Sequence, residues 1–336
     1  MVDAAPTRLR LHRDGDSAGF PMLADLRRQG TCLAELAGRR EEFSSTGLAR
    51  LGNSSGPIVA FGSGDGWFAA RAAAAYAQQD LGLDYGAASS LETLSYVLPR
   101  HANSDLVGVA ISMSGSADRT NEAAEALRKK GKPVLALTNG SGSELARITG
   151  EKISLNVPDL AAFLTGTTKY TATLLGLMML LEGAAQAKTS RWLPYLTALP
   201  ELLPAVEQFS QELAERFVTR PPTGVRILSA GPNLATAEYG MAKLIKLLPL
   251  PVWSDDVEEF AHRQFWSCPA TDLVIYIATN PAVSRCASAS AAALGSMGMT
   301  TVAIDTPACP VSGAGARFTL PDLPESLSPL FAAIPL

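Results

Sequence analysis

One segment constrains the fold of this 336-residue chain more than any other: an apolar strand that leads through a serine-rich loop into a helix. Residues 106–111 (Leu-Val-Gly-Val-Ala-Ile) have the uninterrupted apolar character of a strand buried on both faces. Residues 112–116 (Ser-Met-Ser-Gly-Ser) form the loop, and apolar residues recur at helical spacing within 118–130. A strand, loop and helix in this order predict an α/β fold built on a parallel sheet.

The same loop is a candidate anion site. Backbone N–H groups at a helix N-terminus, together with the hydroxyls of Ser112, Ser114 and Ser116, would point toward one place. The helix dipole adds partial positive charge there, which suits a phosphate group. The loop lacks the glycine triplet of a dinucleotide-binding motif. Taken alone, it is equally compatible with an ordinary turn that caps its helix.

Neighbouring segments complete a pattern. A second apolar strand, 133–139, ends in Thr-Asn and is followed by Ser-Glu-Leu-Ala at 143–146. A first strand with a glycine turn occupies 58–66, and Gly-Thr-Thr-Lys occupies 166–169. In this order the segments resemble the sugar isomerase (SIS) domain family, in which a Ser-Thr-Lys segment covers the sugar in glucosamine-6-phosphate synthase and its relatives. The resemblance implies that the ligand, a sugar phosphate or an amino sugar, contacts Gly64, Asp65, Gly66, Ser112, Ser114, Gly115, Ser116, Thr120, Thr167, Thr168 and Lys169.

The second half repeats the theme. A strand at 225–230 leads into Gly-Pro-Asn-Leu-Ala-Thr-Ala (231–237), which is similar to the opening of the second SIS domain in the synthase. Strands at 273–278 and 300–304 flank a helix at about 283–297. The resemblance implies an α/β fold of two SIS domains, each a flavodoxin-like parallel sheet flanked by helices, related by pseudo-twofold symmetry. We expect a helical lead-in at 1–44, SIS domain 1 at 45–190, and SIS domain 2 at 205–336 with a C-terminus shorter than in the family. The stretch 186–204 is expected to be a connector, with a helix from about 205.

The candidate catalytic residues lie in the second half. Residues 253–262 resemble the Glu-Leu-Lys-His segment of the synthase and the Glu-Phe-x-His segment of related deglycases. By this resemblance, His262 opens the sugar ring, with Glu259 in the same segment. Imidazole suits that step because its pKa lies near working pH. In such relatives the histidine often reaches a neighbouring subunit, which implies a homodimer with its active site near the subunit interface.

The position of the isomerase base departs from the family. The synthase family places a glutamate sixteen residues before the histidine, and here that position is Lys246. The family's nearby lysine is kept as Lys243. Glu238, two turns before Lys246, is the alternative carboxylate, although it is interpreted equally well as a surface glutamate. If Lys246 is buried beside Lys243, its lowered pKa would let it act as an acid, a base or a Schiff-base amine.

The phosphate-binding positions depart too. The family's serine after the glycine turn falls on Gly66, its glutamine on Met113, and its threonine on Ala117. Each lost charge-assisted hydrogen bond weakens phosphate binding by roughly 1.5–3 kcal/mol. Asp65, at the mouth of the turn, would repel an anion or accept a hydrogen bond from a sugar hydroxyl.

Composition excludes several classes of partner. A net charge of −4 without a basic run argues against nucleic acid. The most apolar run, 174–181, is shorter than the ~20 residues that span a bilayer. We therefore expect it to form a buried core helix, and we expect no membrane as a partner. The polar N-terminus does not resemble a signal peptide, and the four cysteines lack metal-site spacing. We therefore expect a cytoplasmic protein with no metal and no cofactor.

Three functions remain open from the sequence. The first is an aldose–ketose isomerase, or an aminosugar-phosphate deaminase or deglycase, that acts on an open-chain sugar with altered acid–base residues. The second is an SIS enzyme repurposed in secondary metabolism that uses Lys246. The third is a non-catalytic sugar-phosphate-binding protein, because a fold alone does not establish a reaction.

Overall fold

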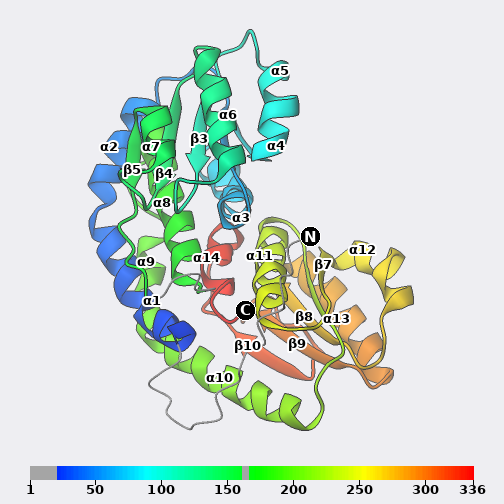
Figure 1. The fold of residues 1–336 in the computed structure, drawn as a ribbon. Helices are drawn as coiled ribbons and strands as arrows, with labels where there is room; N and C mark the ends of the chain where they lie inside the picture. Colours follow the sequence, from blue (N-terminus) through cyan, green and yellow to red (C-terminus); the bar gives the residue numbers. More distant parts are fainter. Residues whose placement is uncertain (1–20, 161–165) are drawn as a thin grey trace, which may run out of the picture.

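The computed structural model describes residues 21–160 and 166–336, and its first half is organised around one parallel sheet (Figure 1). The strand order is β2-β1-β3-β4-β5, the flavodoxin-like arrangement. All residues of β1, β3 and β4 are buried, which agrees with their uninterrupted apolar sequences. The five strands are β1 (Ile58–Gly62), β2 (Tyr85–Ser89), β3 (Val107–Ile111), β4 (Val134–Thr138) and β5 (Lys152–Ser154).

The second half contains another five-stranded parallel sheet. Its order, β7-β6-β8-β9-β10, has the same topology as the first sheet. The fold prediction of two flavodoxin-like α/β units is therefore confirmed. The strands are β6 (Val225–Ser229), β7 (Val252–Asp256), β8 (Leu273–Ala278), β9 (Thr300–Asp305) and β10 (Ala316–Thr319).

Helices cover both faces of the first sheet. Helix α8 (Thr168–Ala184) is buried along almost its whole length, so the prediction of a core helix at 174–181 is confirmed. None of the helices in the described ranges combines the length and the apolar character needed to cross a bilayer. The other helical elements are α3 (Asp65–Ala72), η2 (Tyr76–Asp80), α4 (Ser90–Glu92), η3 (Thr93–Val97), α5 (Leu98–Arg100), α6 (Asp118–Lys129) and α7 (Glu144–Thr149).

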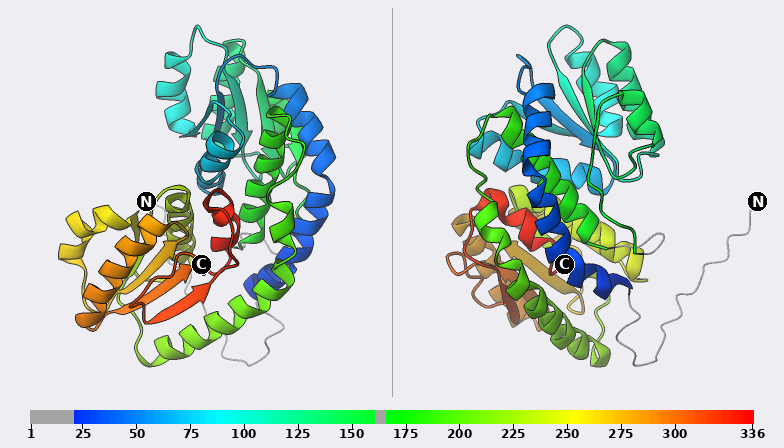
Figure 2. Two further views of the ribbon diagram at one scale, coloured as in Figure 1. Left: turned by 180° about the vertical axis from the view of Figure 1, so that it is seen from behind. Right: turned by 90° about the vertical axis from the view of Figure 1, so that its left-hand side faces the viewer.

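Two helices precede the first strand, and two more connect the sheets. Helices α1 (Pro21–Gly38) and α2 (Arg40–Arg50) lie along α8 (Figure 2). After α9 (Leu193–Leu196), the connecting helix α10 spans Leu199–Thr219. The stretch 186–204 does connect the two halves, but the helix expected from about residue 205 already begins at Leu199. Pro200 lies in the first turn of α10, where a missing N–H costs nothing, so the helix starts earlier than its proline content suggested.

The two halves share one hydrophobic core. Helix α14 (Ser328–Ala332) is fully buried and packs against both α8 and α11 (Pro232–Leu247), and Figure 1 shows it between the two sheets. Helices α3 and α11 occupy equivalent places, each after the first strand of its sheet along the chain, and they pack against each other. The remaining helical elements are α12 (Val257–His262), η4 (Gln264–Ser267), α13 (Pro281–Ser296) and η5 (Glu325–Leu327). Of the expected lead-in at 1–44, residues 1–20 lie outside the described residues.

Candidate active site

The glycine turn after β1 and the serine loop after β3 lie side by side. Gly62 pairs with Ile111 in the parallel ladder, so the carboxyl ends of the two strands are adjacent. A Cβ added to Gly66 would lie 2.7 Å from the carbonyl oxygen of Ile111, so this position admits only glycine without a backbone shift. The structure thus brings together two of the predicted ligand-binding segments at the edge of the sheet where ligands of parallel sheets bind.

Hydrogen bonds within the serine loop hold its conformation. The Gly115 N–H donates to Ser112 Oγ at 3.1 Å. Both the N–H and the hydroxyl of Ser116 donate to Ser114 Oγ, at 3.3 and 2.9 Å. Gly115 has a left-handed conformation (φ +64°), and a Cβ there would lie 2.1 Å from Ser143 Oγ. Because Ser143 caps α7, the loop is wedged against the start of that helix.

Thr120 lies in the first turn of α6, the helix that follows the serine loop. Its side chain is fully buried, and its hydroxyl lies 2.9 Å from Ser90 Oγ, which also accepts a hydrogen bond from Ser63. The polar groups of Thr120 and Ser90 therefore satisfy each other. In this arrangement Thr120 holds α6 against α4 rather than facing the open side of the loop.

The segment 166–168 is anchored to α1. The Thr168 N–H donates to Asp25 Oδ2 at 3.0 Å, and its hydroxyl donates to the Asp25 carbonyl oxygen at 2.8 Å. The Thr167 hydroxyl donates to Gln29 Oε1 at 2.5 Å. A Cβ at Gly166 would lie 2.1 Å from Asp25 Oδ2. Both threonines thus fix the start of α8, while the next residue, Lys169, pairs with Asp159.

An interdomain cluster joins the glycine turn to the second half; we define it as Asp65, Tyr170, Tyr239 and Lys243. The Lys243 ammonium lies 2.5 Å from Asp65 Oδ2 and is almost fully buried, with 7% of the residue exposed. It also lies 5.0 Å from the centroid of the Tyr239 ring. That ring stacks on Tyr170 at a centroid distance of 3.8 Å. The Tyr239 hydroxyl is buried without a hydrogen-bond partner among the described residues.

Lys169 lies within the electrostatic reach of this cluster. Burial lowers the pKa of Lys169; the carboxylates of Asp25 and Asp65 oppose that shift, and the nearby cations Arg28 and Lys243 add to it. Thr173, one turn further along α8, donates to Met113 Sδ of the serine loop at 3.2 Å. The start of α8, the serine loop and the interdomain cluster are therefore continuous.

A second ion pair joins α3 to α11. Arg71 pairs with Glu238, and its guanidinium carbon lies 5.1 Å from the centroid of the Trp67 ring. Burial raises the pKa of Glu238, and the attraction of Arg71 opposes that rise. Glu238 is therefore partly buried, with 21% of its side chain exposed, and α11 directs its carboxyl at the first half of the chain.

The candidate histidine lies elsewhere. Figure 1 and the reverse view in Figure 2 show α12, which His262 ends, on the flank opposite α2. The His262 side chain is 66% exposed, and its Nε2 lies 3.6 Å from Glu258 Oε1. Glu258 Oε2 accepts a hydrogen bond from Cys286, and Glu259 is exposed beside Arg263. No hydrogen bond or ion pair within the described ranges links α12 to the serine loop, so one chain does not bring the two together.

Lys246 is exposed on α11, unlike Lys243. The sequence argument for Lys246 as an acid, base or Schiff-base amine required burial beside Lys243. That condition is not met within one chain, because α3 covers the side of α11 that carries Lys243 and not the end of the helix.

Comparison with known proteins identifies the first half. A family model described as the SIS domain matches residues 54–183, the range that carries the glycine turn, the serine loop and α8. Residues 54–183 are an SIS domain. No curated protein matches the sequence.

Solved structures extend the likeness over both sheets. The C-terminal domain of glucosamine-fructose-6-phosphate aminotransferase from Francisella tularensis aligns with a TM-score of 0.75 and 14% identity over 95% of this chain and 94% of that chain. Tagatose-6-phosphate ketose/aldose isomerase from Escherichia coli aligns with a TM-score of 0.72 and 15% identity, covering 94% and 90%. Glucosamine-6-phosphate deaminase from Thermotoga maritima aligns with a TM-score of 0.71 and 16% identity, covering 94% and 91%. At such low identities, the likeness establishes the fold and not the reaction.

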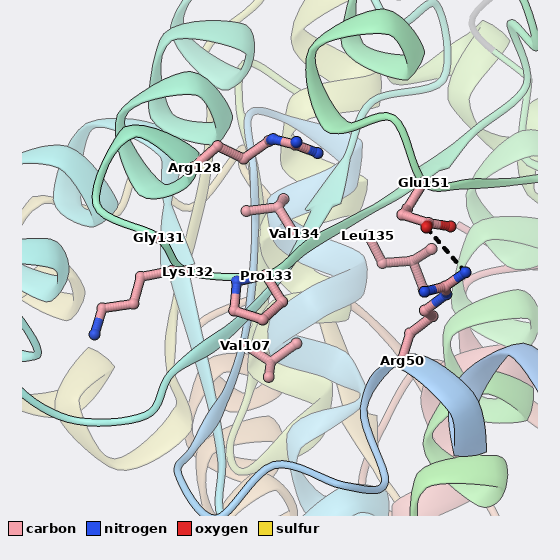
Figure 3. A pocket seen from close by; sticks show the side chains of 9 residues that line it. All are labelled: Arg50, Val107, Arg128, Gly131, Lys132, Pro133, Val134, Leu135 and Glu151. Atoms are coloured by element: carbon pink, nitrogen blue, oxygen red, sulfur yellow. Dashed lines mark ion pairs between the residues drawn. The ribbon is translucent and has the colours of Figure 1, made fainter.

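A pocket at the other end of the SIS-domain sheet is not part of this site. It has a volume of about 290 Å³ and lies at the amino ends of β3 and β4, where the side chains of Arg50 and Glu151 pair at 2.9 Å (Figure 3). Arg128 and Lys132 also line it. Within the described ranges, no group of three or more His, Cys, Asp or Glu side chains is arranged to hold a metal ion.

Several residues of the SIS-domain site carry no sequence signal of their own. Tyr170 and Tyr239 are ordinary helix residues that acquire a role only because α8 and α11 meet. Arg71 becomes informative only as the partner of Glu238. Asp25 had a detectable signal, because it lies on the face of α1 that also buries Leu33 and Leu36. A carboxylate on such a face needs a partner, and here the start of α8 supplies it.

The Arg71–Glu238 pair allows a test of the interface. Replacing Arg71 by alanine leaves a partly buried carboxylate without its cation, which is expected to lower the free energy of unfolding by about 1–2 kcal/mol at pH 8. Because burial already raises the pKa of Glu238, the carboxyl takes up a proton as the pH falls and the loss shrinks toward pH 4. Urea unfolding at the two pH values measures this. Arg119→Ala, which breaks the exposed pair with Glu122, is the control and should change stability by less than about 0.5 kcal/mol. An equal loss at both pH values for Arg71→Ala would contradict the electrostatic account.

Proposed function

We propose that this chain is an enzyme that acts on an open-chain sugar, either as an aldose–ketose isomerase or as a deaminase or deglycase of an amino sugar. The observation that carries the proposal is the position of the Asp65–Lys243 pair. It combines a carboxylate and a buried ammonium at the carboxyl end of the SIS-domain sheet, next to the hydroxyls of the serine loop. Such groups can bind sugar hydroxyls and move protons between them.

Each group has a proposed role. The serine loop and the glycine turn hold the sugar, and Lys243, whose charge Asp65 balances, donates a hydrogen bond to the carbonyl oxygen when the C2 proton is removed. Glu238 is the proposed base for that proton, because burial raises its pKa toward the working pH and so favours reversible transfer. In isomerisation the proton returns at C1. In a deaminase the same shift precedes loss of the amine by hydrolysis.

His262 and Glu259 enter this scheme only through a second copy of the chain. His262 is exposed on the outer flank of the second half, so its proposed ring-opening role requires a partner subunit to present it to the site. This supports the proposal of a homodimer with its active sites near the subunit interface. Residues 45–190 and 205–336 are proposed as the two structural units of each subunit. We propose a cytoplasmic location, since all four cysteines are free.

Two alternatives remain distinguishable. An enzyme repurposed for an unusual substrate would use Lys246 in place of the family's glutamate, and its exposed position would then have to be covered by the partner subunit. A sugar-binding protein without activity would keep the serine loop and the interdomain cluster and exchange no proton.

Incubating the protein with a panel of aldoses, ketoses, amino sugars and their phosphates in D2O, followed by NMR, tests the proposal. Loss of the C2–H signal of one sugar is the expected result. Glu238→Gln is expected to abolish the exchange, because an amide cannot accept the proton, whereas Lys246→Ala is expected to retain it. The reverse pattern would establish the Lys246 alternative. Binding of a sugar without exchange in the unaltered protein would reject an enzyme in favour of a binding protein.

A further inference from the structure

We infer that the ligand of this site is a sugar without a phosphate group and that Asp65 is the residue that sets this specificity. The inference rests on the proposed function, because it concerns the sugar that the same site binds. It goes beyond that function by excluding the phosphorylated sugars that the names of the similar structures mention.

The positive charge available to an anion is already neutralised. Lys243 is the buried cation nearest the glycine turn, and its Nζ already pairs with Asp65 Oδ2 at 2.5 Å. Asp65 is also the first residue of α3, so its carboxylate takes up the favourable field at that helix N-terminus. A phosphate at this helix N-terminus would be repelled by the Asp65 carboxylate, which already interacts with the positive groups that would stabilise it.

The serine loop offers a ligand few hydrogen-bond donors, because most of its donors already bond within the loop. The N–H groups of Gly115 and Ser116 and the hydroxyl of Ser116 all donate within the loop. The hydroxyl hydrogens of Ser112 and Ser114 remain as neutral donors. The first turn of α6 has open N–H groups, but it also carries the carboxylate of Asp118.

The neighbouring positions cannot supply what the loop lacks. Met113 and Ala117 have no hydrogen-bond donor in their side chains. At Gly66, a Cβ would lie 2.7 Å from the Ile111 carbonyl oxygen and 3.0 Å from its Cγ2, so packing against β3 excludes any hydroxyl-bearing side chain. The missing donor at this position is therefore a property of the backbone packing.

The groups that remain suit a hydroxyl-bearing carbon chain. The Asp65 carboxylate accepts hydrogen bonds, and the hydroxyls of Ser112 and Ser114 both donate and accept. Sugar hydroxyls satisfy such a set without bringing a charge into a partly buried site. A phosphate dianion would need several charge-assisted bonds to offset its desolvation.

Isothermal titration calorimetry with matched pairs tests this inference. The probes are D-fructose and fructose 6-phosphate, D-glucosamine and glucosamine 6-phosphate, and inorganic phosphate, all at constant ionic strength. In the unaltered protein, the phosphorylated member is expected to bind no more than about threefold tighter than its partner, and inorganic phosphate is not expected to compete. Asp65→Asn frees the Lys243 charge and is expected to tighten binding of the phosphorylated member by about tenfold or more. Glu125→Gln, which removes an exposed charge on α6, is the control and should leave both members unchanged.

The outcomes separate the two ideas. A preference of the unaltered protein for a sugar phosphate of about thirtyfold or more would overturn the inference and leave the proposed function standing. Absence of binding for every sugar in the panel would overturn both. The comparison in the unaltered protein does not depend on a variant, so it decides the matter even if Asp65→Asn fails to fold.

Discussion

Replacing His262 by alanine is expected to lower turnover by about 10²–10⁴-fold, the usual contribution of a positioned acid–base group. Because this side chain is 66% exposed and makes one 3.6 Å contact with Glu258, the substitution is expected to leave the unfolding midpoint unchanged. Steady-state kinetics on the substrate found by NMR would measure the first effect and thermal unfolding the second. The loss should fall on kcat, since ring opening follows binding.

His101→Ala is the matched control, because His101 bonds to Ser104 near the amino end of the first sheet and has no proposed role. A mixing experiment then locates His262. If His262 of one subunit completes the site that contains Lys243 of the other, His262→Ala and Lys243→Ala chains mixed in equal amounts regain activity at about a quarter of the sites. Full activity of the His262→Ala protein would reject the family-based role of this residue. Monomers in light scattering would reject the crossing of subunits.

The second large effect is expected at Gly115, where alanine should both destabilise the chain and abolish ligand binding. Two independent costs add there. The φ angle of +64° is strained for any residue with a Cβ, and the new Cβ would lie 2.1 Å from Ser143 Oγ and 2.3 Å from Ser143 Cβ. We expect a loss of about 2–4 kcal/mol in the free energy of unfolding, because the loop has to move away from α7.

Gly131→Ala separates the two costs. Gly131 has a similar φ of +73°, but an added Cβ there meets no atom within 4 Å, so only the backbone strain of about 1 kcal/mol remains. Urea unfolding of both variants gives the difference, and calorimetry with the cognate sugar gives the loss of binding. If the two variants lose equal stability and Gly115→Ala still binds, the contact with Ser143 does not hold the loop.

The sequence predicted the inner strands of both sheets and missed the outer ones. β1, β3, β4, β6, β8 and β9 are mostly apolar and almost fully buried, because each has a neighbouring strand on both sides. The four edge strands, β2, β5, β7 and β10, were not predicted. β2 reads Tyr-Gly-Ala-Ala-Ser and β5 has three residues, so neither shows the β-branched enrichment or the alternation that marks a strand. Pairing with an inner strand, and not local preference, makes them strands.

The candidate site was predictable where one strand–loop–helix unit contains it. The glycine turn and the serine loop belong to adjacent strands, so their proximity follows from the topology. The sequence could not show whether Lys246 lies at the site, because β7 and the residues on either side of it separate Lys246 from His262. Whether a lysine on α11 is buried depends on α3, which is about 170 residues earlier in the sequence. For the same reason, the ion pair of Arg71 with Glu238 had no local signature.

The core shared by the two halves limits how this chain can diverge from its relatives. Tyr170 and Tyr239 stack across the boundary, and α14 packs against α8 from one half and α11 from the other. Since protein interiors are close-packed, a change of side-chain volume on any of these helices has to be matched on another. Substitutions that accumulate in one half therefore select compensating substitutions in the other. Although the two sheets share one topology, substitutions in the two halves are therefore expected to be correlated and not independent.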